Sequence, residues 1–187
     1  MNGKKELPNW ARSGRSQWEY FGQKRPSFAI EPNKNQESVW DYPRPPKIEK
    51  DSRHILVKIN DTIIVDTSNA IRILETASPP TFYLPPLDIN FEHLIKASGS
   101  SRCEWKGTAL YWDIITPIIS LKNVGWSYPQ PFEDYSDISG YLSFYPAHLE
   151  CYVDNERVRP QPGGFYGGWI TNEIVGPVKG EDPRAYL

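Results

Sequence analysis

Sulfur and histidine are scarce in this sequence. Its 187 residues include two cysteines, three histidines and one methionine. Cys103 and Cys151 are too few for the disulfide framework of a small secreted domain, so we expect free thiols and a cytoplasmic location. The cysteines and histidines form no C-x2-C or H-x3-H pattern. A structural zinc site of the usual spacing is therefore excluded, and we expect no metal and no other cofactor.

Long apolar runs are also absent. No stretch approaches the roughly 18 consecutive apolar residues of a membrane span, and the basic N-terminus is not followed by the apolar segment of a secretory signal. Basic and acidic residues nearly balance, with a formal net charge of −2. The chain as a whole therefore has no strong attraction for nucleic acid. We expect neither a membrane nor a nucleic-acid partner, and the sequence indicates no oligomeric state.

Aromatic residues, proline and glycine are abundant: 13% of the chain is aromatic, and it contains 18 prolines and 13 glycines. Many turns and large flat side chains favour short strands over long helices. Two β-branched runs around Asn60-Asp61 predict a hairpin, and residues 88–94 have the spacing of one or two helical turns. The sequence thus predicts a mainly β fold of two packed or rolled antiparallel sheets with one or two short helices. The expected strands are residues 54–59, 62–66, 70–75, 81–84, 108–115, 118–126, 141–145 and 149–153.

The chain divides into three predicted parts. Residues 1–36 form an irregular arm, because seven Lys and Arg stand against three Glu there without helical or strand periodicity. Residues 37–180 form a single β domain, and residues 181–187 form a C-terminal tail. The arm's aromatic side chains could dock on the main domain, or the basic segment could contact a partner or a nucleic-acid backbone. These side chains are Trp10, Trp18, Tyr20, Phe21 and Phe28.

Residues 43–46 place three prolines around Arg44. Since proline has no N–H to donate, this segment cannot be a helix or an inner strand. An extended, polyproline-like path is expected instead. We predict that it lies along a surface, with Trp40 and Tyr42 as anchors.

The densest candidate for a site is the run RPQPGGFYGGW at residues 159–169. Its four glycines permit close backbone approach and could bring N–H groups together as an anion nest. Phe165, Tyr166 and Trp169 could stack on a planar ligand. A kinked strand, in which glycines let neighbouring aromatics pack, explains the same pattern. No Gly-Lys-Ser/Thr follows and no helix opens there, so neither a Walker loop nor a dinucleotide-binding turn is present.

A second candidate is Cys103, which stands between Arg102 and Lys106. Positive potential favours a thiolate over a thiol. A nucleophilic cysteine also needs a base within reach, and the sequence places none of the histidines beside it. The alternative is a buried cysteine that behaves as a small hydrophobe, which is what we expect for Cys151 within the apolar run 149–153.

The third candidate is the pair Arg72 and Glu75, which closes an expected strand. The two residues are an odd number of positions apart, so they face opposite sides of a regular strand. A bend near Glu75 is needed to aim both at one site. An exposed strand pair is the alternative.

Together these motifs resemble the uncharacterised family catalogued as domain of unknown function 427, which is sometimes labelled a nucleotidyltransferase. The similarity runs from about residue 37 to residue 180. The motifs that carry it are, in chain order, ESVWDYPRPP (37–46), RILET (72–76), CEWKG (103–107) with Ala109 and Tyr111-Trp112, WSYP (126–129), Gly140-Tyr141 with FYP (144–146), and PGGFYGGW (162–169).

The resemblance implies a compact β domain related to the Mss4-like, or β-tent, architecture, and the arm looks like the extension of cyanobacterial-type members. Relatives of that fold often hold zinc between C-x2-C knuckles, which this chain lacks, so the metal does not carry over. The nucleotidyltransferase label would require paired carboxylates for two metal ions after a Gly-Ser turn. Here residues 98–102 are followed by Cys103. The label therefore finds no support in these residues.

We expect the motif residues to meet at one small-ligand pocket lined by Cys103, Lys106 and the glycine-rich loop. The protein would then be an enzyme that acts on a small molecule. The alternatives are a non-catalytic module that binds a small molecule or peptide, and an interaction module that uses the arm. The candidate catalytic residues are Cys103, Lys106, Glu75 and Arg72, and the candidate ligand-binding residues are Trp40, Arg44, Tyr111, Gly164, Tyr166 and Trp169.

Overall fold

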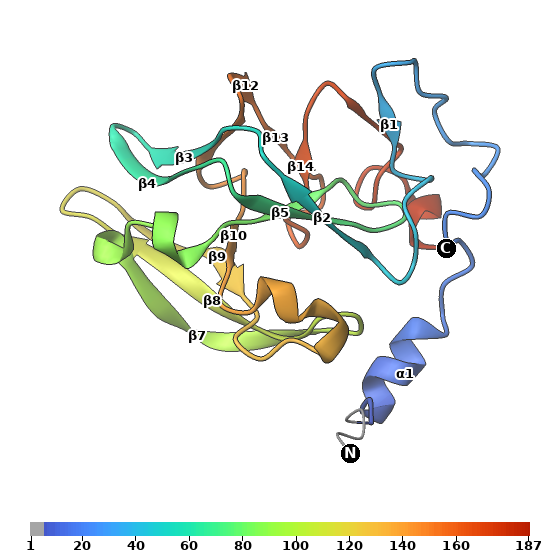
Figure 1. Ribbon diagram of the computed structural model, residues 1–187, viewed down its shortest axis with the longest axis horizontal. Coiled ribbons are helices and arrows are strands. Elements are labelled where there is room, and N and C mark those ends of the chain that lie inside the picture. The colour runs from blue at the N-terminus through green and yellow to red at the C-terminus, as the bar shows by residue number, and fades with distance from the viewer. Residues whose placement is uncertain (1–5) are drawn as a thin grey trace.

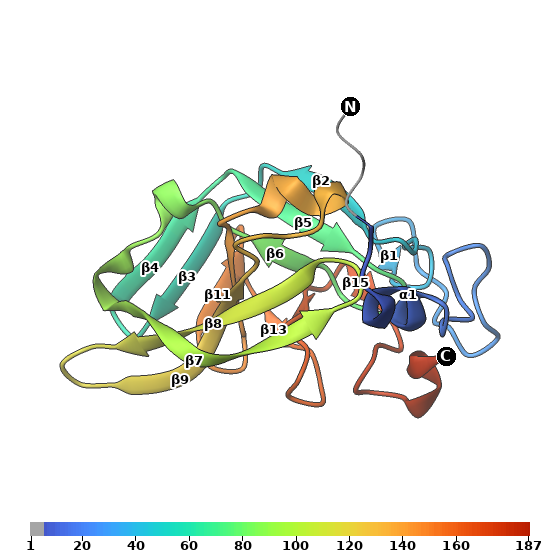
Figure 2. The ribbon, with the colours of Figure 1, turned by 90° about the horizontal axis from the view of Figure 1, so that it is seen from below.

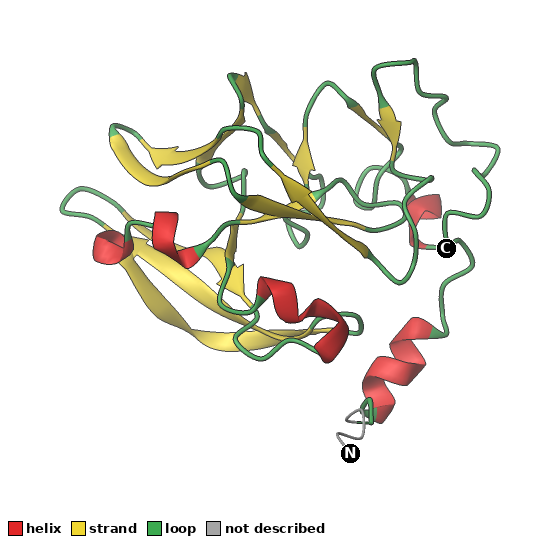
Figure 3. Ribbon diagram, in the orientation of Figure 1, coloured by secondary structure: helices red, strands yellow, loops and turns green. Residues whose placement is uncertain are grey.

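Short strands dominate the structure, a computed structural model that describes residues 6–187 (Figure 3). This confirms the prediction of a mainly β fold with antiparallel sheets. The strands fall into two four-stranded sheets, one three-stranded sheet and two short pairs, which is a finer division than the two sheets expected. None of the helices formed by the described residues has the length and apolar character needed to cross a bilayer.

The first four-stranded sheet has the order β10-β9-β8-β7. It consists of β7 (Leu94–Cys103), β8 (Gly107–Ile115), β9 (Ser120–Ser127) and β10 (Leu142–Phe144). β7 was not expected, because its sequence, LIKASGSSRC, has no alternation of apolar residues. It is an edge strand with most of its residues exposed, so its pairing with β8 rather than burial fixes it.

The second four-stranded sheet has the order β12-β11-β3-β4. Its strands are β3 (Ile55–Ile59), β4 (Thr62–Thr67), β11 (Glu150–Val153) and β12 (Glu156–Arg157). β3 and β4 pair antiparallel around the expected Asn60-Asp61 turn, and Asn60 has a φ of 52°. Asparagine tolerates this left-handed region better than most residues, as the tight turn requires.

A three-stranded sheet joins these two layers. It contains β2 (Lys47–Asp51), β5 (Ala70–Leu74) and β6 (Thr81–Tyr83) in the order β2-β5-β6. An antiparallel bridge between Leu84 and Leu142 links the end of β6 to β10. β6 therefore lies beside the first four-stranded sheet, and the core fills the space between the layers. Two short pairs complete the strands: β1 (Glu37–Ser38) with β15 (Ile174–Val175), and β13 (Arg159–Pro160) with β14 (Trp169–Ile170).

Helical segments are few and short. Four are 3-10 helices: η1 (Pro86–Asp88), η2 (Phe91–His93), η3 (Glu133–Ile138) and η4 (Pro183–Tyr186). η2 lies within residues 88–94, where one or two helical turns were expected, whereas η1 ends at Asp88. The one α-helix of residues 6–187, α1 (Asn9–Arg15), lies in the arm, so the arm is not wholly irregular. Its helix has no apolar periodicity, and tertiary contacts with the main domain hold it.

The arm runs along one side of the domain, from α1 to β1, beside the C-terminal segment (Figures 1 and 2). Three of its aromatic side chains dock on rings of the main domain, whereas Phe21 is exposed. The rings of Tyr20 and Phe28 lie 5.4 and 5.2 Å from that of Trp40, and Trp10 lies 5.9 Å from Phe132. Of the two roles open to these aromatics, the described contacts show docking.

Asp41 and Pro45 in the proline segment are exposed, whereas the residues between them are turned inward, with Trp40 and Tyr42 as the expected anchors. Trp40, Tyr42 and Arg44 are all less than a tenth exposed. They belong to a core region shared with the arm and the C-terminal segment. The sequence argument correctly excluded helix and inner strand. It missed the burial because the covering residues lie at both ends of the chain.

Candidate functional site

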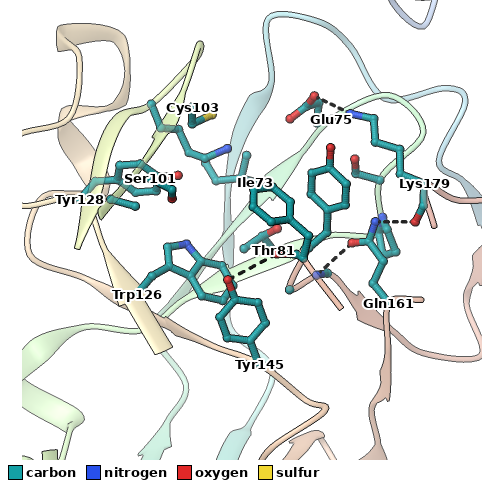
Figure 4. A pocket seen from close by; sticks show the side chains of 18 of the residues that line it. Ile73, Glu75, Thr81, Ser101, Cys103, Trp126, Tyr128, Tyr145, Gln161 and Lys179 are labelled. Carbon is teal, nitrogen blue, oxygen red and sulfur yellow. Dashed lines mark hydrogen bonds and ion pairs between the residues drawn. The ribbon is translucent and has the colours of Figure 1, made fainter. Parts of the chain in front are cut away.

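A cavity of about 260 Å³ opens where the three-stranded sheet meets the first four-stranded sheet. Glu75 follows β5, Tyr83 ends β6, Cys103 ends β7, and Lys106 occupies the turn before β8. Figure 4 shows Glu75 and Lys179 on one side of the cavity and Cys103 and Tyr128 on the other. The ends of four strands thus bring together groups that are far apart in sequence.

Glu75 lies among three cations. Lys179 Nζ donates to Glu75 Oε1 at 3.2 Å, and Arg44 Nε lies 3.4 Å from the same oxygen. Burial disfavours the charged carboxylate, but Lys179, Lys106 and Arg44 outweigh it and hold the pKa of Glu75 below its ordinary value. Burial lowers the pKa of Lys179 and of Arg44, against the attraction of Glu75. Glu75 is therefore an ionised carboxylate at the centre of a positive cluster.

Lys106 is the member of this cluster that lacks a counterion in contact. Its residue is 8% exposed, and within residues 6–187 no carboxylate forms an ion pair with its ammonium. Burial opposes its charged form, but Cys103, Tyr83 and Glu75 outweigh that effect and raise its pKa. The surroundings therefore favour the ammonium, although no described carboxylate is in contact with it. Its Nζ lies 6.0 Å from the centroid of the Tyr128 ring, which is a long cation–π contact.

Cys103 and two tyrosines surround Lys106. Cys103 is partly exposed and lines the cavity. Burial raises the pKa of Tyr128 well above its ordinary value, and the neighbouring Cys103 adds to that shift. Burial also raises the pKa of Tyr83 to about 12. Both phenols are therefore neutral hydrogen-bond donors at neutral pH. The thiol stands among donors and a cation, with no histidine among the cavity's lining residues.

Aromatic rings form the opposite wall. The rings of Trp126 and Tyr145 lie 4.5 Å apart, and Trp126 Nε1 donates to the Tyr83 hydroxyl at 3.3 Å. Tyr111 donates to Ser101 Oγ at 2.8 Å. Tyr166 also lines the cavity, and burial raises its pKa to about 12. A flat apolar surface therefore faces the charged groups across the cavity, as Figure 4 shows for Trp126 and Tyr145.

Gly167 and Gly168, the second glycine pair of the run at residues 159–169, line one side of the cavity. A Cβ on Gly167 would lie 2.2 Å from Trp126 Cη2, and one on Gly168 would lie 2.4 Å from Gln161 Oε1. Gly168 N donates to that oxygen at 3.1 Å, and Gln161 Nε2 donates to Lys179 O at 2.9 Å. These glycines are required because backbone packs directly on side chains there. This is the packing explanation that the sequence left open.

The structure brings five of the predicted residues to this cavity and keeps the others away. Cys103, Lys106, Glu75, Tyr111 and Tyr166 line it. Arg44 lies just behind, in contact with Glu75. The remaining four, Arg72, Trp40, Trp169 and Gly164, do not line it.

Each residue that lies elsewhere has a structural reason. Arg72 faces the other side of β5, where it bonds Glu49 and Glu37, as its odd spacing from Glu75 requires. Trp40 is buried beneath the arm and donates to Pro177 O at 3.0 Å. Trp169 is buried against Phe82 in the main core. Gly164 has a φ of 72° in an exposed part of the loop.

Sequence reasoning missed three groups that complete the site: Lys179, Gln161 and Trp18. Lys179 follows the expected strands by more than twenty residues and shows no motif. Gln161 sits between two prolines, where the glycines drew attention instead. Trp18 was named only as an arm aromatic, although it lines the cavity. The one signal that the sequence offered for Trp18 was its aromatic side chain within the basic arm.

Cys151 is buried, whereas Cys103 is partly exposed. Cys151 is 1% exposed, and burial raises the pKa of its thiol. This agrees with the expectation of a small hydrophobe in the core. Among residues 6–187, no three His, Cys, Asp or Glu side chains gather in a way that could hold a metal ion.

Comparison with known families gives one match. The model of a family described as a domain of unknown function (DUF427) and labelled NTP_transf_9 matches residues 47–157. The matched span carries Glu75, Cys103 and Lys106, whereas Trp18, Arg44 and Lys179 lie outside it. A comparison with curated proteins finds no match.

Proposed function

The chain belongs to the DUF427 family, whose function is unknown, and we propose from its site that it binds a small organic anion. The observation that carries this proposal is the buried Lys106 ammonium, with which no carboxylate of residues 6–187 is in contact. Three cations, Lys106, Lys179 and Arg44, lie around Glu75, and Glu104 adds a second carboxylate at longer range. The balance remains positive.

An anionic group on the ligand would supply the missing counterion. Charge-assisted hydrogen bonds from an ammonium are about twice as strong as neutral ones, and they are stronger still in a site shielded from water. The aromatic wall of Trp126 and Tyr145 suits a planar or apolar part of the same molecule. The cavity volume of about 260 Å³ limits the ligand to a small one.

The test compares three matched probes by isothermal titration calorimetry: phenyl phosphate, neutral benzyl alcohol and cationic benzylamine. We expect measurable affinity for phenyl phosphate alone. Lys106→Met should weaken that affinity, and Lys50→Met is the matched control, because Lys50 is exposed on β2 and away from the cavity. Equal binding of all three probes, or equal binding by both variants, would contradict the proposal.

A second candidate, thiol-dependent catalysis on the bound anion, is favoured by Cys103 in the cavity wall beside Lys106. The thiolate would attack an electrophilic carbon of the ligand, forming an S–C bond while the leaving group departs with its electron pair. Glu75 and Lys106 would act through charge, because the depressed pKa of Glu75 makes it a poor proton donor at neutral pH.

Charge-selective alkylation tests this second candidate. Iodoacetate and iodoacetamide react with a thiolate in the same way, as an S–C bond forms and iodide leaves, but only iodoacetate is an anion. We expect the ratio of the two rates at Cys103 to exceed that of glutathione about tenfold, which corresponds to about 1.4 kcal/mol of attraction. A ratio equal to that of glutathione would show that the thiol lies outside the positive cluster's influence.

The third alternative, a module that docks a partner through its arm, draws no support from the described contacts. The aromatic residues that such a surface would use are engaged within the chain. Trp10, Tyr20 and Phe28 each contact a ring of the main domain or the proline segment.

A further inference from the structure

Trp18, from the arm, contacts both cations that flank Glu75. The centroid of its ring lies 3.9 Å from Arg44 Cζ and 4.1 Å from Lys179 Nζ. Its Nε1 donates to Glu104 Oε1 at 2.9 Å. A ring at these distances stabilises cations through its quadrupole without neutralising their charge. Trp18 thus holds two cations of the site in place and leaves their charge available to a ligand.

The arm is attached to the short turn that links Cys103 to Lys106. Arg15 Nε donates to Glu104 O at 2.8 Å, and Arg15 Cζ lies 4.9 Å from the Trp105 ring. Gly14 packs so closely that an added Cβ would lie 2.8 Å from Glu104 Cβ. α1 is therefore fixed to residues 104–105, directly between Cys103 and Lys106.

The arm is also attached to Arg44, one of the two cations in contact with Trp18. Arg44 Nη1 donates to Tyr20 O at 2.8 Å, and Arg44 Nη2 donates to Thr76 O at 2.9 Å. Arg44 therefore links the arm to the residue next to Glu75. The contacts on either side of Trp18 connect the arm to both walls of the cavity.

We propose that the arm is a cover that completes the anion site, with Trp18 as the positioning residue that orients Lys179 and Arg44 and limits exchange of the ligand. The family match spans residues 47–157 and so omits Trp18, Arg44 and Lys179. The matched span supplies the thiol and Lys106, and the two flanks supply the other two cations, Arg44 and Lys179, and the cover.

The first experiment needs no ligand and measures access to the cavity. Neutral iodoacetamide alkylates Cys103 in the full chain, and mass spectrometry separates it from Cys151, which is 1% exposed and reports global unfolding. The variants are Trp18→Ala, Trp18→Phe and Gly14→Ala. Ser13→Ala is the matched control, since Ser13 is an exposed neighbour on α1.

We expect Trp18→Ala and Gly14→Ala to speed alkylation of Cys103 about tenfold while Cys151 stays protected. Trp18→Phe, which keeps a ring, and Ser13→Ala should react within about twofold of the wild type. Wild-type rates in both Trp18→Ala and Gly14→Ala would overturn the proposal. If Trp18→Ala also exposes Cys151, it has unfolded, and Gly14→Ala alone decides.

The second experiment rests on the proposed anion site and measures phenyl phosphate by stopped-flow fluorescence. Trp18→Ala should raise the dissociation rate about tenfold, and Trp18→Phe should restore most of the affinity. If phenyl phosphate fails to bind the wild type, the proposed function fails, and the alkylation rates still decide whether the arm covers the cavity. If it binds the wild type and Trp18→Ala equally, the positioning role of Trp18 is wrong and the anion site stands.

Discussion

Replacing Lys106 by methionine separates a binding role from a purely structural one, because only a binding role predicts weaker binding of phenyl phosphate. Methionine has a similar length and apolar volume, so the cavity wall is kept while the charge is removed. In the free protein, Lys106 is a buried ammonium with no carboxylate in contact among residues 6–187. Cys103, Tyr83 and Glu75 nevertheless outweigh burial and raise its pKa, so removing the charge should lower stability.

The expected loss in unfolding free energy is about 0.5–3 kcal/mol, the range usual for single substitutions. For a chain of this size, each 1 kcal/mol corresponds to about 2–4 °C in Tm. The variant should therefore melt about 1–12 °C lower than the wild type. Urea unfolding followed by tryptophan fluorescence measures the free energy.

The same variant should bind phenyl phosphate more weakly. A hydrogen bond to a charged group contributes about 1.5–3 kcal/mol, which corresponds to a Kd about 10- to 150-fold higher. Lys50→Met, an exposed lysine on β2, should change neither quantity appreciably.

The result that would refute this reasoning is a loss of stability without a loss of anion affinity. If Lys106 served chiefly as a counterion for Glu75, its removal would leave a buried carboxylate short of a partner and cost about 3–5 kcal/mol. Unchanged anion affinity together with such a loss would make Lys106 a structural cation and remove the main support for an anion site.

Three further predictions concern the other side of the cluster. Glu75→Gln should destabilise the fold by about 3–5 kcal/mol in urea unfolding, because it leaves buried cations uncompensated. The same variant should bind phenyl phosphate more tightly in calorimetry, since the competing carboxylate is gone. Weaker binding would contradict a positively charged site. The pKa of Glu75 is held down against burial by its cationic neighbours, so its contribution to stability is complete above its ordinary value of 4.5 and is lost as the pH falls through the lower value of the folded state. Glu75→Gln should accordingly flatten the decline of unfolding free energy below about pH 4.5, and an unaltered acid profile would place the acid sensitivity elsewhere. Gly167→Ala puts a Cβ 2.2 Å from Trp126 and should lower the unfolding free energy by about 1–3 kcal/mol through overpacking. An unchanged unfolding free energy would mean that the Trp126 side chain moves to make room.

Local sequence signals predicted most of the strands, because strand formation depends largely on residues that are close together in the sequence. The Asn60-Asp61 turn and the β-branched runs around it predicted β3 and β4. β7 was not predicted, because an exposed edge strand needs no alternation of apolar residues. The helix in the arm was not predicted, because it is held by contacts with residues far away in sequence, namely those of Arg15 with Glu104 and Trp105.

The candidate site was only half predictable for a similar reason. Cys103 and Lys106 share one turn, so charge beside a thiol was visible in the sequence. Trp40 and Trp169 carry the same chemical types as ligand-binding residues, yet the fold uses them to fill its core. A sequence shows which groups are available, but burial depends on what the rest of the chain places over them.

By itself the sequence determined a mainly β chain, its principal strands, its family, and the thiol and lysine at the centre of the site. The tertiary structure alone decided that Lys179 and Trp18, from opposite ends of the chain, meet over Glu75, while Arg72 on the same strand faces away. Strand propensity and turn chemistry act over a few residues. Charge balance and closure of a cavity depend on distances in space, and these are set only when distant segments pack together.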